Sequence, residues 1–187
     1  LAAAGIEHLA PVEELVSAAD PEGRVTPRSR LLCAGLGLLA RAAYRALSGS
    51  GELEHRVGVA SSLLSLLTKV DDQVIDSLAF HGGATTDRAL LRARTRAYLA
   101  PTLASLARAE PVSDDPRCAL AARTGRELRA LAGSRERLEH LVALIARGWE
   151  IQVDGVATFR SANGAVSRRY PRVFQELVDY SASRHCT

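Results

Sequence analysis

The chain has 187 residues, of which 47% are hydrophobic and 24% are charged, so it is long enough to bury an apolar core and too hydrophobic for global disorder. Its 24 basic and 21 acidic side chains give a formal charge of +3, and no run of Lys and Arg lies among aromatic residues, which argues against nucleic acid as a partner. Aromatic residues make up only 4% and Met is absent. A chain dominated by Leu, Ala and Arg favours helices over sheets.

The sequence shows no sign of secretion or of a membrane anchor. The three cysteines, Cys33, Cys118 and Cys186, are far apart and form no CxxC pair, which is typical of reduced thiols. The first residues lack the basic region and continuous apolar core of a signal peptide. The most apolar stretch, residues 31–44, contains Arg41 and falls short of the roughly 20 residues of a membrane span. We therefore expect a cytoplasmic protein with no transmembrane segment.

Proline and glycine clusters divide the chain into helical patterns. A short helix is expected after Pro11, and Thr26-Pro27 supplies an N-cap and a first-turn proline for a helix over 27–47. A long helix over 52–80 ends at His81-Gly82-Gly83, where glycine adopts the left-handed conformation at little cost. Further helices are expected over 86–108, 115–132, 135–158 and 171–183.

These elements predict an all-α fold. We find no internal repeat, heptad array or alternating strand pattern in the sequence. The expected architecture is a single-domain antiparallel helical bundle that spans residues 1–187. Because the chain starts without Met, truncation at one or both ends is part of this expectation.

The segment 69–83 places three aspartates on a helix that is otherwise rich in Leu and Val. Asp72 and Asp76 are one turn apart, so their side chains project in the same direction about 6 Å from each other. Their face of the helix also carries Lys69 and small serines, which suits a face that looks into a cavity. Paired carboxylates suit Mg²⁺, which is usually held by one or two carboxylates together with waters and substrate phosphates. A solvated polar face is the alternative interpretation.

Asp71 does not share that face. On a helical wheel it falls between Leu78 and Leu64, inside the apolar arc that faces the core. Burial of an unpaired carboxylate is costly, so Asp71 needs a partner. Solvation explains the other two aspartates but does not explain Asp71.

A second acidic pair lies on the helix predicted over 135–158. Glu150 and Asp154 are again four residues apart, and Arg147 lies on the same face. If one acidic pair binds a metal ion for a diphosphate, this pair would face it from the opposite wall of a cavity. A normal charged helix surface with i, i+4 pairing remains the alternative.

The segment "DDQVID" followed by "SLAFHGGATT" resembles the aspartate-rich motif of the class I isoprenoid synthases, nearest to the squalene/phytoene-synthase-like and terpene-synthase-like members. The resemblance implies an all-α bundle around a central cavity, in which two acidic motifs bind Mg²⁺ ions that hold an allylic prenyl diphosphate. It assigns Asp71, Asp72 and Asp76 to the first metal-binding motif and Glu150 and Asp154 to the second. Asp72 and Asp76 would then be the catalytic pair, with Asp71 as a flanking ligand or an orienting acceptor.

"SRRYP" follows the second motif and is similar to the diphosphate-binding residues of these families. The expected diphosphate-binding residues are Lys69, Arg147, Arg168, Arg169 and Tyr170. Mg²⁺ and these cations would stabilise the charge that develops as diphosphate leaves. Family domains are longer than this chain, so the resemblance leaves three options: missing helices, a small cavity, or a homodimer that completes the site.

Two other functions compete with this interpretation. A di-metal helical oxygenase needs Glu-x-x-His motifs on two helices, and the sequence offers only Glu52 to His55 at that spacing. A non-catalytic helical domain for ligand binding or protein interaction would use its acidic pairs structurally. The sequence shows no helix-turn-helix with a basic recognition helix, so DNA binding lacks support.

Overall fold

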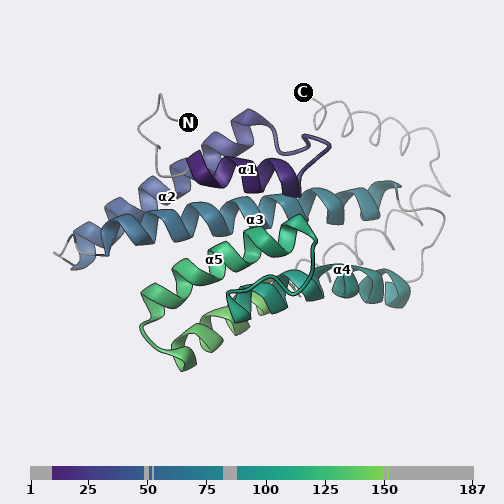
Figure 1. Ribbon diagram of the computed structural model, residues 1–187. Helices are drawn as coiled ribbons and strands as arrows, with labels where there is room; N and C mark the ends of the chain where they lie inside the picture. Colours follow the sequence, from purple (N-terminus) through teal and green to yellow (C-terminus); the bar gives the residue numbers. More distant parts are fainter. Residues whose placement is uncertain (1–9, 49–50, 52, 82–87, 150, 152–187) are drawn as a thin grey trace.

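The computed structural model describes residues 10–48, 51, 53–81, 88–149 and 151, and the side chains of 10, 11, 73–81, 88 and 91 are not described. Within these residues the chain forms helices and no strand (Figure 1), which confirms the all-α prediction. A helix over 135–149 follows the five labelled helices, which are α1 (Ala10–Ala19), α2 (Pro27–Ser48), α3 (Glu54–His81), α4 (Arg88–Arg108) and α5 (Pro116–Ala132).

Capping residues mark the ends of α2 and α5, and the Thr26-Pro27 start of α2 is the one that the sequence predicts. The Thr26 hydroxyl accepts a hydrogen bond from the Ser29 amide at 3.2 Å, at the start of α2. Asp115 caps α5 by accepting from the Arg117 amide, with Pro116 in the first turn. Gly133 ends α5 at φ 68°, a conformation that glycine adopts without a Cβ clash. For the helices that the structure describes, the predicted boundaries agree closely with the observed ones. The predicted helix over 171–183 and the predicted helix end at 158 lie outside the described residues.

Helices α2 and α3 pack as an antiparallel pair through small residues. A Cβ atom on Gly37 would lie 2.5 Å from the Gly58 carbonyl oxygen and 1.9 Å from the Ser62 hydroxyl. Further along α2, Arg41 forms an ion pair with the buried Glu54. As the residue numbers of the contacts rise along α2, the numbers of their partners on α3 fall, so the two helices run in opposite directions. Only glycine permits this close approach of the two backbones.

Helices α4 and α5 run in the same direction, which departs from the predicted antiparallel arrangement. Arg117 at the start of α5 contacts Tyr98 on α4, whereas Arg129 near the end of α5 donates to the carbonyl of Arg108 at the end of α4. The non-helical segment 109–115 runs back along α4 between them (Figure 1). An extended chain advances about twice as far per residue as a helix, so this short segment can return to the start of the next helix.

The core lies where α5 packs against α1, α3 and α4. It is built from aliphatic side chains, with fully buried leucines on α3 (Leu63 and Leu67), α4 (Leu106) and α5 (Leu120). Trp149 of the helix over 135–149 joins this core at 5% exposure. The predicted core-facing arc of α3 is thereby confirmed for its described members, and it also places Asp71 at the contact with α4 and α5.

Candidate functional site

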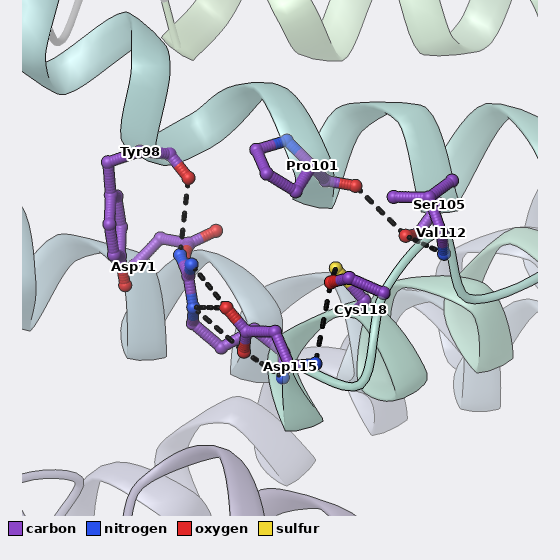
Figure 2. A network of polar contacts seen from close by, with 9 residues as sticks. Asp71, Tyr98, Pro101, Ser105, Val112, Asp115 and Cys118 are labelled. Carbon is purple, nitrogen blue, oxygen red and sulfur yellow. Dashed lines mark hydrogen bonds and ion pairs between the residues drawn. The ribbon is translucent and has the colours of Figure 1, made fainter.

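Asp71 is buried where α3 meets α4 and α5, and only 1% of its surface is exposed. Its Oδ1 accepts a hydrogen bond from Nη1 of Arg117, with the two atoms 3.2 Å apart (Figure 2). The guanidinium comes from the first turn of α5, forty-six positions away in sequence. The partner that the position of Asp71 requires is therefore Arg117.

Arg117 is itself held in place by the residues around the start of α5. Asp115 accepts from its side chain at Nε and Nη2, with the Nη2 contact at 2.6 Å. The guanidinium carbon also lies 3.7 Å from the centre of the Tyr98 ring, a distance at which a cation is attracted to the ring face. Because the capping residue of α5 also grips Arg117, the start of this helix presents a fixed cation to α3 (Figure 2). We call Asp71, Tyr98, Asp115 and Arg117 the buried charge cluster.

Burial decides the protonation behaviour of Asp71. Removal from water raises the pKa of this carboxyl to about 6, although the positive charge and hydrogen bond of Arg117 and the nearby Tyr98 hydroxyl lower it. Burial also raises the pKa of Tyr98, and the Asp71 charge adds to this effect. For Asp115 burial acts upward, but the hydrogen bonds from Arg117 dominate and lower its pKa. The cluster thus holds one fully ionised acid and one that titrates close to neutral pH.

Two polar atoms of the cluster and one further hydroxyl of α4 lack a hydrogen bond of standard geometry to the part of the chain that the structure describes. They are Oδ2 of Asp71, the Tyr98 hydroxyl and the Thr102 hydroxyl, all inaccessible to solvent. The Tyr98 hydroxyl nevertheless lies close enough to Asp71 to lower the pKa of its carboxyl. An incompletely satisfied buried carboxylate is costly, which agrees with the raised pKa of Asp71.

The other predicted residues of α3 lie outside the buried charge cluster. Lys69 donates to Oδ2 of Asp72 at 3.0 Å, and both side chains are roughly 30% exposed. Asp76 lies one turn further along α3, and its side chain is not described. The structure therefore separates Asp71, which is buried, from Asp72, which is accessible, as their wheel positions predict.

Neither acidic residue of the second predicted motif is described, although the predicted diphosphate-binding residue on the same helix is. Arg147 is exposed on the helix over 135–149. Glu150, Asp154, Arg168, Arg169 and Tyr170 lie outside the described residues. It therefore stays a prediction that the two acidic motifs face each other across a cavity.

In the described part of the chain, neither a cluster of metal ligands nor a cavity coincides with the predicted site residues. It contains no group of three or more His, Cys, Asp or Glu side chains placed to hold a metal ion. A cavity of about 740 Å³ opens between the ends of α4 and α5 and the helix over 135–149, lined by Arg108, Arg129 and Arg135 among others. Lys69, Asp71, Asp72 and Arg147 do not line it.

Sequence reasoning found Asp71 but missed its partners. A signal for Arg117 was present, because Asp115-Pro116 marks a helix start and the next residue is a cation in the first turn, where the helix dipole disfavours positive charge. A cation in that position suggests an anionic partner elsewhere in the fold. Tyr98 gave no such signal, since an aromatic residue on a helix is usually an ordinary core residue.

Comparison of the chain with known protein families, with curated proteins and with solved structures gives no match. The chemistry of the described residues must therefore support any functional conclusion.

Proposed function

We propose that the chain is a Mg²⁺-dependent enzyme of the isoprenoid-synthase type, which ionises an allylic prenyl diphosphate for terpene cyclisation or prenyl coupling. The observation that supports this most directly is the separation of the aspartates on α3. Asp71 is buried against Arg117, whereas Asp72 is partly exposed beside Lys69. The helical architecture and the aliphatic interior suit an enzyme of this type, whose expected cavity must shield a carbocation from water.

The donor set fits an ion that the substrate helps to hold. Asp72 and Asp76 are one turn apart on α3, and Mg²⁺ needs only one or two carboxylates when waters and phosphate oxygens complete its shell. A protein-only metal cage would need more ligands than the described residues bring together. In this proposal Asp72 and Asp76 bind the ion, which supplies charge neutralisation for the leaving diphosphate. Glu150 and Asp154 retain their proposed role as the second metal-binding pair.

Asp71 serves this site as a positioning residue. One of its oxygens is engaged by Arg117 and the side chain is almost fully buried, so it anchors the rotation of α3 about its axis. Successive side chains of a helix are about 100° apart, and this anchor therefore sets the direction in which Asp72 and Asp76 project. Of the two roles expected for Asp71, the contacts favour the orienting acceptor over the flanking ligand.

Cations near the aspartates would bind the diphosphate. Lys69 lies against Asp72 with about 30% of its side chain exposed, so its ammonium group is accessible to a substrate oxygen. Arg147 is exposed on another helix, and Arg168, Arg169 and Tyr170 keep the role that the sequence resemblance gives them. Several cations would share the charge of a leaving diphosphate, because one ammonium group neutralises only part of it.

A non-catalytic helical domain for ligand binding or protein interaction is the second candidate. It is favoured by the pairing of the two α3 aspartates whose side chains are described, Asp71 with Arg117 and Asp72 with Lys69. Such pairs can be wholly structural. In that case the cluster only fixes the packing of α3, α4 and α5.

An assay of pyrophosphate release separates these candidates. It uses prenyl diphosphates of several chain lengths, with and without Mg²⁺. We expect release that requires Mg²⁺ and falls roughly 100-fold or more in Asp72→Asn and Asp76→Asn, because each removes a charge that acts in the transition state. Asp71→Asn should slow the reaction less, since a positioning residue does not touch the metal. Asp114→Asn is the matched control, because this aspartate is exposed in the segment between α4 and α5.

Circular dichroism must show that each variant keeps its helices. If the wild-type chain shows no Mg²⁺-dependent turnover of any of these substrates, the proposed enzyme function is refuted and the non-catalytic domain remains. Full activity in a folded Asp72→Asn, Asp76→Asn double variant would refute the metal site.

A further inference from the structure

Within the part of the chain that the structure describes, helix α2 leaves a broad apolar face exposed. All six of its leucines are exposed, between 44% for Leu38 and 88% for Leu47. Leu32, Leu36 and Leu39 recur at helical spacing, so they form one stripe along the helix. Soluble proteins rarely expose a contiguous apolar stripe of this kind without a binding function.

The opposite face explains why these leucines cannot turn inward. The buried residues of α2 are Cys33, Ala34 and Gly37, and Gly37 lies so close to α3 that even a Cβ atom would collide with the Gly58 carbonyl. A leucine at that contact would force the two helices apart. The exposure of the leucines is therefore fixed by the packing of α2 on α3.

The charges of α2 are all positive. The helix contains no acidic residue and four arginines. Arg30 and Arg41 pair with Glu13 and Glu54 of neighbouring helices. Arg28 is exposed near the beginning of α2. Arg45 is 74% exposed near its end, where its Nε lies 3.8 Å from the Glu54 carboxylate. The leucine stripe is therefore flanked by an exposed cation at each end.

This helix is suited to lie on a membrane surface. Among the described helices, α2 is the one whose length and apolar composition would suffice to cross a bilayer, and 17% of its apolar window is buried. Among the described residues, α2 packs against α3 along one side and exposes its leucines on another. A helix with one apolar face and arginines at its flanks binds in the plane of the interface.

We propose that α2 docks the protein on an anionic phospholipid bilayer, with its leucines at the boundary between headgroups and acyl chains and with Arg28 and Arg45 against the headgroups. A second copy of the chain fits less well, because two such faces would bring exposed arginines together without a carboxylate on either helix. This inference does not depend on the proposed enzyme function.

Vesicle flotation of the 187-residue chain tests the docking surface. We expect the chain to float with vesicles that contain phosphatidylserine, to bind phosphatidylcholine vesicles much more weakly, and to be released by salt. The double variant Leu36→Glu, Leu39→Glu should bind at least about tenfold more weakly, because it places charge in the apolar stripe. Arg28→Gln and Arg45→Gln should each weaken binding about fivefold.

Leu144→Glu is the matched control, because Leu144 is 57% exposed on a different helix. It should bind like wild type, and circular dichroism should show native helix content in every variant. Wild-type chain that fails to float with anionic vesicles overturns the proposal, as does equal binding to neutral ones. A different result would assign the leucine face to a second copy of the chain. In that case the wild-type chain would be a dimer that does not bind vesicles, and the Leu36→Glu, Leu39→Glu change would convert it to a monomer.

Discussion

Replacement of Asp71 by Asn should stabilise the protein at neutral pH, although it removes one partner of a buried ion pair. Asn has nearly the shape of Asp and accepts a hydrogen bond from Arg117 through its amide oxygen. It carries no charge, so it avoids the desolvation that raises the pKa of Asp71 to about 6. Arg117 meanwhile keeps its contacts with Asp115.

The size of this effect follows from the pKa of Asp71. A rise from 3.8 to about 6 means that ionisation of Asp71 costs the folded state about 3 kcal/mol relative to the unfolded chain. The folded pKa lies above the unfolded one, so the folded state holds the proton more tightly. The penalty is therefore absent below about pH 4, develops between pH 4 and 6, and is complete above pH 6.

Urea unfolding, monitored by circular dichroism from pH 4 to pH 7.5, measures this difference. We expect Asp71→Asn to raise the free energy of unfolding by up to about 3 kcal/mol at pH 7 and by almost nothing at pH 4. The exposed Asp114→Asn change should have little effect at either pH. A loss of stability in Asp71→Asn that is greater at pH 7 than at pH 4 would refute this reasoning, because it would show that attraction to Arg117 outweighs burial.

Three further predictions concern backbone packing and capping, and urea unfolding measures each of them. Gly37→Ala should destabilise the protein by about 1–3 kcal/mol because its Cβ meets α3, whereas Gly35→Ala, with no atom within 4 Å, should stabilise it by up to about 1 kcal/mol; equal effects would contradict the close helix contact. Gly125→Ala should cost about 1–3 kcal/mol or more, since its Cβ would lie 2.2 Å from the Leu106 carbonyl oxygen, and an unchanged midpoint would contradict the observed α4–α5 packing. Asp20→Ala should cost about 1–2 kcal/mol because the Asp20 carboxylate accepts two backbone hydrogen bonds at 2.9 and 2.7 Å; a smaller loss than in the exposed-site variant Asp114→Ala would refute that role.

Much of the helical architecture could be predicted because its signals are local. Thr26-Pro27, Asp115-Pro116 and Gly133 act within one turn of the chain, so the sequence contains all that is needed to place those helix ends. The spacing of apolar residues likewise predicted which face of α3 enters the core. Direction was less predictable, because the parallel course of α4 and α5 depends on how segment 109–115 folds back along α4.

Of the candidate site, the sequence predicted the contrast among the aspartates but left Asp71 without a partner. Arg117 reaches Asp71 from a different helix, and no periodicity within α3 contains that information. The facing of Asp72 and Asp76 toward Glu150 and Asp154 stays a prediction, since it depends on residues beyond the described part of the chain.

By itself the sequence determined that this protein is helical, where most of its helices begin and end, and that Asp71 belongs to an apolar face. These properties arise from interactions within a few residues. Only the tertiary structure decided that Arg117 compensates Asp71, that α5 runs parallel to α4, and that the leucines of α2 point away from the core. Each of these depends on the approach of distant segments, and the apolar pattern of α2 alone does not distinguish a buried stripe from an exposed one.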